Sequence, residues 1–385
     1  MIRVLIADDS AFMRKVLSDL FNKQSDFEVA GTAINGKDAV DKVKKLQPDL
    51  LTLDVTMPVM DGLNALAIIM EENPVPVVMV SSATQRGADA TIRALALGAV
   101  DFISKAGGPI SKIDTISDEL LDKCRSAAKA HVSKFRASES RPVSYRPRLP
   151  DPPALKQIEV KRKTGFVLGQ KPVINKIPSQ SPNLITATFA PSIGTGKKLV
   201  VIGTSTGGPQ ALQTVITRLP GNLPCGVVVV QHMPAGFTKS LAERLNSISE
   251  IAVKEAEHDE LIKPGQVYIA PGDFQLRIAP ALNGERKILL SKDPPVGNHR
   301  PAVNVMFDSA AQFGKDLVSV IMTGMGSDGC KGMKKIKDNG GYSIAQDEPS
   351  CVVYGMPKAV VDAGLADEVR PLTKIAEAIV EAVRR

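Results

Sequence analysis

Short apolar runs alternate with amphipathic helical stretches along the first 123 residues. The apolar runs are typical of buried strands, and each is short enough to be one strand of a sheet. Five strand–helix units in this length predict a doubly wound parallel sheet, whose functional site lies at the carboxyl ends of the strands. The expected strands lie near Val4–Ala7, Val29–Thr32, Leu50–Leu53, Val77–Val80 and Asp101–Ser104.

The same alternation returns over residues 198–385 and predicts a second α/β domain with a mostly parallel sheet. An apolar run from Leu199 to Ile202 leads into residues 203–209, which read GTSTGGP. A second run ends just before His232, and a third leads into residues 323–329, which read TGMGSDG. Strand ends in this half therefore also collect polar groups.

The segment between the two domains, residues 124–197, shows no sustained apolar period and mixes prolines with basic residues. Residues 125–198 hold 15 Lys and Arg against 3 Asp and Glu, whereas residues 1–124 have a net charge of −5 and residues 199–385 a net charge of zero. The basic excess thus belongs to a solvated linker. A soluble tether is favoured over nonspecific contact with lipid or nucleic acid, and no specific nucleic-acid partner is expected.

Cysteine usage and hydropathy place limits on the compartment. The four cysteines are scattered, with no C-x-x-C pair and no metal-ligand spacing. No apolar stretch approaches the length needed to span a bilayer, and the N-terminus leads straight into a strand. We therefore expect a cytoplasmic protein that is not an integral membrane protein.

Acidic residues gather at the strand ends of the first domain. Asp8 and Asp9 follow the first expected strand, and Asp54 ends the third. Three carboxylates on one rim repel one another, and Mg²⁺ is the divalent cation that best fits their oxygen ligands. The cation would screen an incoming phosphoryl group, so that Asp54 becomes an aspartyl phosphate. Lys105 is expected to pair with the phosphoryl oxygens, and the Ser81 hydroxyl to move towards them as a switch.

The second domain offers a nucleophile, a base and an acid at its strand ends. Ser205 lies in a Gly-x-Ser-x-Gly turn, which on its own is also typical of an N-cap or a phosphate cradle. Of the four histidines only His232 ends a strongly apolar strand, whereas His131, His258 and His299 lie in the linker entrance, a charged turn and a loop. With Asp328 in its glycine-rich turn, the order Ser–His–Asp differs from that of the α/β-hydrolases.

The first domain resembles the response-regulator receiver family. The matching features are DDS at residues 8–10, LDVTMPVMDG at 53–62, the serine pair at 81–82 and Lys105. The resemblance implies phosphorylation at Asp54 with Mg²⁺ held by Asp8, Asp9 and Asp54, and it makes Phe102 a switch residue beside Ser81 and Lys105. Ala106 departs from the family, which usually has proline after the lysine.

Residues 198–385 resemble the catalytic domain of the chemotaxis protein-glutamate methylesterase (CheB) family. Besides residues 203–209 and 323–329, the matching stretches are QHMP at 231–234, VYIAPGD at 267–273, AQDE at 345–348 and SCVVYGMP at 350–357. The resemblance makes Ser205 the nucleophile, His232 its base, Asp328 the group that orients the imidazole, and the Met325 backbone N–H an oxyanion donor. Ala302 and Asn304 stand where the family commonly has serine and aspartate, and Gln275 where histidine is frequent.

The implied activity is phosphorylation-regulated hydrolysis of γ-glutamyl methyl esters on methyl-accepting chemotaxis receptors, with release of methanol and a second activity as a glutaminase. The implied phosphodonor is the histidine kinase CheA, the implied process is chemotaxis adaptation, and the esterase site needs no cofactor. We further expect the unphosphorylated receiver domain to cover part of the Ser205 rim, although a purely activating contact is the alternative.

Three other functions compete with this interpretation. A phosphorylation-gated binding module with a degenerate hydrolase domain would need no intact triad, yet all three residues are present. A hydrolase that acts on another acyl substrate would share these features, because the specificity of such an enzyme depends on its loops. A transcription factor is disfavoured, because residues 199–385 show an α/β pattern with no evident helix-turn-helix.

Overall fold

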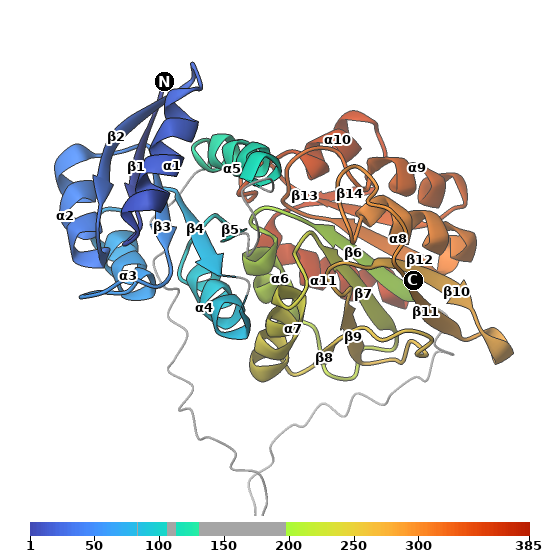
Figure 1. Cartoon of the computed structure of the whole chain (residues 1–385). Helices are drawn as coiled ribbons and strands as arrows, with labels where there is room; N and C mark the ends of the chain where they lie inside the picture. The colour runs from blue at the N-terminus through green and yellow to red at the C-terminus, as the bar shows by residue number, and fades with distance from the viewer. Residues whose placement is uncertain (83, 106–112, 131–197) are drawn as a thin grey trace, which may run out of the picture. The chain divides into compact units, whose positions relative to one another are not determined.

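The computed structural model describes residues 1–82, 84–105, 113–130 and 198–385 (Figure 1). Ala106 and most of the expected linker lie outside the described residues. The described residues of both domains belong to one compact unit. The expected domain boundaries, 1–123, 124–197 and 198–385, stay predictions.

The N-terminal domain is a five-stranded parallel sheet in the order β2-β1-β3-β4-β5, as the apolar pattern predicted. Each strand except the last is followed by a helix that crosses back over the sheet, and α5 follows β5 in the chain (Figure 1). The strands are β1 (Ile2–Ala7), β2 (Phe27–Ala33), β3 (Leu50–Asp54), β4 (Val77–Ser82) and β5 (Asp101–Lys105), and the helices are α1 (Ala11–Asn22), α2 (Gly36–Leu46), α3 (Gly62–Glu72), α4 (Gln85–Ala96) and α5 (Ile113–Ala127).

Local sequence explains where the helices of this domain begin. The first four start after a polar residue whose side chain accepts a backbone N–H from the first turn, which satisfies one of the free donors at a helix start. These N-cap residues are Ser10, Asn35, Asp61 and Thr84. The strand β3, at the centre of the sheet, is buried along its whole length, so its last residue, Asp54, is held in a nearly closed environment.

The C-terminal domain is built on a seven-stranded sheet in the order β14-β13-β12-β6-β7-β9-β8, and every paired neighbour is parallel. A separate antiparallel hairpin consists of β10 and β11. The strands are β6 (Leu199–Thr204), β7 (Gly226–Gln231), β8 (Ala252–Glu255), β9 (Gln266–Ile269), β10 (Gln275–Pro280), β11 (Arg286–Ser291), β12 (Leu317–Ile321), β13 (Tyr342–Gln346) and β14 (Glu368–Arg370).

Helices cover both faces of this sheet, which explains why its strands read as continuous apolar runs. One face packs against α6, α7 and α11, and the other against α8, α9 and α10 (Figure 1). The helices are α6 (Gly208–Ile216), α7 (Phe237–Ile248), α8 (Val303–Ala310), α9 (Cys330–Asp338), α10 (Met356–Asp362) and α11 (Leu372–Arg384), with two short 3₁₀ turns at Leu282–Gly284 and Ala311–Asp316.

The strand order places the functional rim of the C-terminal domain. From β6 the chain moves to β7 on one side and later returns to β12 on the other side of β6. Ligands of open α/β sheets bind at such a switch point, beyond the carboxyl ends of the strands. The loops that follow β6, β7 and β12 carry Ser205, His232 and Asp328, so the topology brings all three to one rim.

Among the described residues, no helix is both long enough and apolar enough to cross a lipid bilayer.

Candidate functional site

The turn that carries Ser205 is held between two strands. The Ser205 backbone N–H donates to Thr323 O at 3.0 Å, and the Ser205 carbonyl accepts the Gly208 N–H at 2.7 Å as α6 begins. Gly207 has a φ of +76°, and a Cβ there would lie 2.5 Å from the Val352 Cβ. Glycine is therefore required in this turn both for its backbone conformation and for space.

Gln231, the last residue of β7, locks the same turn from the other side. Its buried amide donates to Ser205 O at 3.0 Å and accepts the Thr204 hydroxyl at 2.6 Å. A Cβ at Gly208 would lie 1.9 Å from the Gln231 Oε1, so the amide also fills the space beside the start of α6. In the sequence, Gln231 stands out only as part of the QHMP motif, and nothing there signals this contribution.

Ser205, His232 and Asp328 form one line of hydrogen-bonding groups. His232 Nδ1 lies 3.2 Å from the Ser205 Oγ, and its Nε2 lies 2.8 Å from the Asp328 Oδ2. An ionised carboxylate only accepts, which assigns the imidazole proton to Nε2 and leaves the Nδ1 lone pair facing the serine hydroxyl. The side chain of His232 is 6% exposed, so water is largely excluded from this line.

Asp328 is held by the backbone as well as by His232. Its Oδ2 accepts the Val303 N–H at 2.6 Å, and its Oδ1 accepts the N–H groups of Asn304 and Gly329, each at 3.0 Å. Burial opposes ionisation, but the hydrogen bond and charge of His232 and the two N–H groups of α8 outweigh it. The pKa of Asp328 therefore lies below its ordinary value.

The loop after β12 also brings a backbone donor close to Ser205. Gly324 packs so closely that a Cβ there would lie 2.8 Å from the Ser205 Cβ. The next residue is Met325, whose backbone N–H has no hydrogen-bond acceptor among the residues that the structure describes. A free N–H at this place can stabilise a negative oxygen that develops beside Ser205.

The positions at which the sequence departs from the family it resembles surround this line. The buried Gln275 amide accepts the Ala302 N–H at 2.9 Å and donates to His299 O at 3.0 Å. Asn304 Oδ1 accepts the Gly332 N–H at 2.8 Å, which joins α8 to α9. His299, which the sequence placed only in a loop, stacks on His232 with 3.6 Å between ring centroids; nothing in its sequence context signals this contact.

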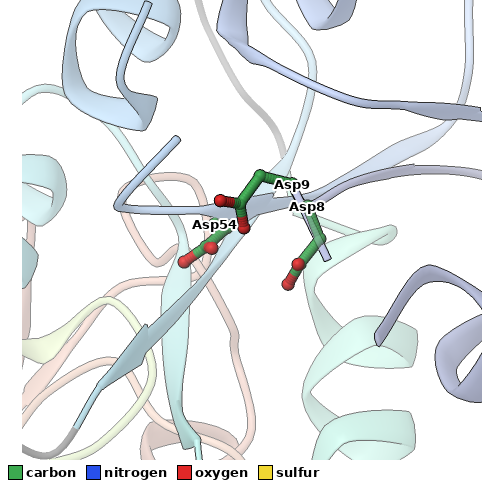
Figure 2. A group of neighbouring side chains, drawn as sticks. All are labelled: Asp8, Asp9 and Asp54. Atoms are coloured by element: carbon green, nitrogen blue, oxygen red, sulfur yellow. The ribbon is translucent and has the colours of Figure 1, made fainter. Parts of the chain in front are cut away.

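In the N-terminal domain, the three expected carboxylates meet at the end of β1 and β3. One oxygen from each of Asp8, Asp9 and Asp54 lies within 4.8 Å of the others, and Figure 2 shows the three side chains gathered. Asp8 is buried, and its Oδ2 has no hydrogen-bond partner among the described residues, although the Lys105 ammonium lies 3.0 Å away. Three carboxylates around one ammonium leave negative charge unbalanced, and their oxygens fit a hard cation such as Mg²⁺.

Lys105 bridges the carboxylates, since its ammonium lies 2.7 Å from the Asp54 Oδ2 as well as near Asp8. Burial opposes its charge, yet these two partners outweigh burial and raise the pKa of Lys105. For Asp54 burial dominates over the pairing with Lys105, and the pKa of Asp54 is raised above its ordinary value. The Ser81 hydroxyl, the expected switch, donates to Gly87 O at 3.1 Å.

The two domains make specific contacts within the compact unit. The Phe102 ring, the expected aromatic switch, stacks on Phe237 at the start of α7, with 4.6 Å between centroids. The Thr206 hydroxyl, next to Ser205, donates to the buried Asp101 carboxylate. Gln210 Nε2 on α6 donates to two carbonyl oxygens of the N-terminal domain, those of Leu95 at 2.6 Å and Ala99 at 2.9 Å.

Each half of the chain matches a known protein family. The profile of the CheB methylesterase family matches residues 200–379, and that of the response regulator receiver domain matches residues 4–116. A protein-glutamate methylesterase/protein-glutamine glutaminase of Symbiobacterium thermophilum is 47% identical and covers 99% of this chain and 97% of its own. The protein of that name from Thermotoga maritima is 45% identical over 99% of this chain and 98% of its own.

Among solved structures, the catalytic domain of the Thermotoga maritima CheB methylesterase is 54% identical to this chain. It covers 48% of this chain and 97% of its own length, with a TM-score of 0.47.

Replacement of Asp54 by asparagine is expected to stabilise the N-terminal domain at pH 7 in the absence of divalent cations. The native pKa of Asp54 exceeds its unfolded value, so its contribution to stability is full below the unfolded pKa and is lost as pH rises through the native pKa. Asparagine keeps the shape without the charge. The measurement is the midpoint of urea unfolding of this domain in EDTA, monitored by amide hydrogen exchange of β3.

Asp41→Asn is the control, because Asp41 is exposed on α2 and its replacement should leave the midpoint unchanged. The advantage of Asp54→Asn should shrink as the pH falls below about 4, because the carboxyl then becomes protonated in the unfolded state as well as in the native state. A lower midpoint for Asp54→Asn at pH 7 would show that the pairing with Lys105 outweighs burial.

Proposed function

Because the chain belongs to the CheB methylesterase family and carries a response-regulator receiver domain, we propose that it hydrolyses γ-glutamyl methyl esters on chemotaxis receptors and releases methanol. The observation that carries this proposal is the line from Ser205 through His232 to Asp328 at the switch point of the sheet. A nucleophile, a base and an orienting carboxylate in this arrangement suit acyl transfer to water.

In the first half of the proposed reaction, His232 Nδ1 takes the Ser205 hydroxyl proton as Oγ bonds to the ester carbonyl carbon. The carbonyl oxygen becomes an oxyanion, to which the Met325 N–H donates. When the tetrahedral intermediate collapses, the bond from carbon to the methoxy oxygen breaks. His232 returns the proton to the methoxy oxygen, so that methanol leaves and the glutamyl acyl group remains on Ser205.

The second half repeats these steps with water. His232 takes a proton from water, whose oxygen attacks the acyl carbon, and the bond from carbon to Ser205 Oγ then breaks. Ser205 regains the proton and a glutamate side chain is released. Throughout, Asp328 holds the Nε2 proton and stabilises the imidazolium that forms twice in each cycle. The esterase site uses only protein groups in this scheme.

The same site suits a side-chain amide. A glutamine carbonyl presented to Ser205 would be attacked in the same way, and the leaving nitrogen would take the proton from His232 and depart as ammonia. The product is again a glutamate side chain. Deamidation of receptor glutamines is therefore the second proposed activity, supported by the name of the relatives.

The receiver domain is proposed to accept a phosphoryl group on Asp54 from a histidine kinase, CheA in this family. Asp8, Asp9 and Asp54 would hold Mg²⁺, which when bound neutralises charge on the phosphoryl oxygens. Asp54 supplies the attacking carboxylate oxygen, and Lys105 lies where it can pair with the transferred oxygens. A role in chemotaxis adaptation and a cytoplasmic location complete the proposal.

Contacts between the domains support the expectation that the unphosphorylated receiver covers part of the Ser205 rim. The Asp101 carboxylate reaches the residue next to Ser205, and the Ser126 hydroxyl on α5 lies 2.7 Å from the Met325 sulfur. Because Phe102 stacks on Phe237, movement of this switch ring on phosphorylation would disturb the contact directly. A coupling of about 1–3 kcal/mol would change activity roughly 5- to 150-fold.

Methanol release from methyl-labelled chemoreceptor membranes tests the proposed activity. The intact protein should release methanol, and a small-molecule phosphodonor with Mg²⁺ should raise the rate. Ser205→Ala should lower the rate by roughly 10⁴-fold or more, because no other group replaces the nucleophile. The control is Ser247→Ala, an exposed serine of α7, which should match the intact protein.

Activity that persists in Ser205→Ala would contradict the assigned nucleophile. Absence of methanol release from folded, phosphorylated protein would instead favour another acyl substrate or a binding module.

Replacement of Gln210 by alanine tests the covering contact. The change removes two hydrogen bonds to the receiver domain, each contributing about 0.5–1.5 kcal/mol, and should raise the unphosphorylated rate roughly fivefold or more. The phosphorylated rate should change little. Gln213→Ala, one turn along the same helix, is the matched control and should behave as the intact protein. A lower unphosphorylated rate in Gln210→Ala would favour a purely activating contact.

A further inference from the structure

The His299 ring lies flat against the ring of His232. Their centroids are 3.6 Å apart and their planes differ by 13°. The edges of the His232 ring are already engaged, by Ser205 on one nitrogen and Asp328 on the other. Those two bonds act within the plane of the ring, whereas His299 lies against its face.

The loop that carries His299 is built to hold it in place. Val296 and His299 exchange two backbone hydrogen bonds of 3.0 and 3.1 Å across Gly297 and Asn298. Both central residues have positive φ, as a tight two-residue turn of this type requires. The buried Gln275 amide then donates to His299 O at 3.0 Å. The backbone of His299 is thus fixed before any substrate binds.

The side chain of His299 is suited to contact His232 through the face of its ring. Among the described residues, no side-chain hydrogen bond of His299 is present, so its nitrogens do not orient His232. Burial, followed by the charge of His232, lowers the pKa of His299 to about 4, while Asp328, Glu119 and Lys123 have smaller effects on it. His299 is therefore uncharged near pH 7 and can face an imidazolium without repelling it.

We propose that His299 is a positioning residue, whose ring face holds His232 in the plane that joins the Ser205 hydroxyl to the Asp328 carboxylate. This inference rests on the proposed function, in which that line carries out acyl transfer. Small displacements of a general base are costly, since a shift of about 1 Å lowers rates by up to roughly 100-fold.

The test compares His299→Ala with His299→Phe in the full-length protein, with Mg²⁺ and phosphodonor present. Alanine removes the ring, whereas phenylalanine keeps a flat ring without nitrogens. We expect His299→Ala to lower kcat for methanol release roughly 10- to 100-fold with KM within about twofold, and His299→Phe to recover kcat to within about threefold of the intact protein. His258→Ala, an exposed histidine, is the control and should not change either constant.

Two readouts do not need the receptor substrate. One is the rate at which a fluorophosphonate labels Ser205, which depends on the base that His232 provides. The other is the ¹⁵N spectrum of the four histidine side chains, in which His232 should show a single Nε2-protonated tautomer in the intact protein and in His299→Phe, but a mixture in His299→Ala. If the intact protein is labelled at Ser205 yet releases no methanol, the proposed substrate fails while the labelling rates still test His299.

Two results would overturn the inference. The ring face would not be needed if folded His299→Ala kept kcat and the labelling rate within twofold of the intact protein and its His232 still showed the single Nε2-protonated tautomer. His299→Phe as impaired as His299→Ala would show that an imidazole nitrogen, rather than the face, is what matters.

Discussion

The Asp328 carboxylate is the group on which the geometry of the site depends. It accepts three backbone N–H groups and one imidazole N–H, and these come from three separate parts of the chain. Val303 and Asn304 begin α8, Gly329 follows Asp328 itself, and His232 follows β7. One buried carboxylate therefore joins the loop after β12, the start of α8 and the end of β7, and it leaves His232 one orientation towards Ser205.

The same bonds set the electrostatics. A helix start carries free N–H groups and a partial positive charge, so a carboxylate placed there stays ionised even when it is buried. An ionised Asp328 fixes the proton of His232 on Nε2, and in the proposed reaction it would stabilise the imidazolium that forms when Nδ1 takes the serine proton. The neutral ring of His299 covers the face of His232, and Asp328 faces its edge, so His232 lies between one charged and one uncharged neighbour.

The sequence pattern predicted much of this arrangement because it depends on strand ends. Apolar runs located the strands, and the polar residue after each run located Ser205, His232 and Asp328 on one rim, where the structure brings them within hydrogen-bonding distance. The receiver carboxylates Asp8, Asp9 and Asp54 were predicted in the same way and also meet. The catalytic roles of Ser205, His232 and Asp328, and the roles of Asp8, Asp9 and Asp54 in metal binding and phosphorylation, stay predictions.

What the pattern missed depends on contacts between distant segments. The start of α8 has no side-chain cap at Ala302, so no local signal marks it; the cap comes from Asp328, which lies on another loop. Likewise, the stacking of His299 depends on a turn held by Gln275 from a different strand. Such pairings follow from the packed fold and leave no periodicity or spacing in the sequence to detect.

The most direct test of this account is the rate of methanol release by Asp328→Asn, measured with methyl-labelled receptor membranes. Asparagine keeps the shape but presents a neutral amide to two helix N–H groups and to His232, so the wrong imidazole tautomer is favoured. We expect a loss in kcat on the order of 10⁴-fold with the fold retained. A folded Asp328→Asn protein with kcat within tenfold of the intact protein would contradict it.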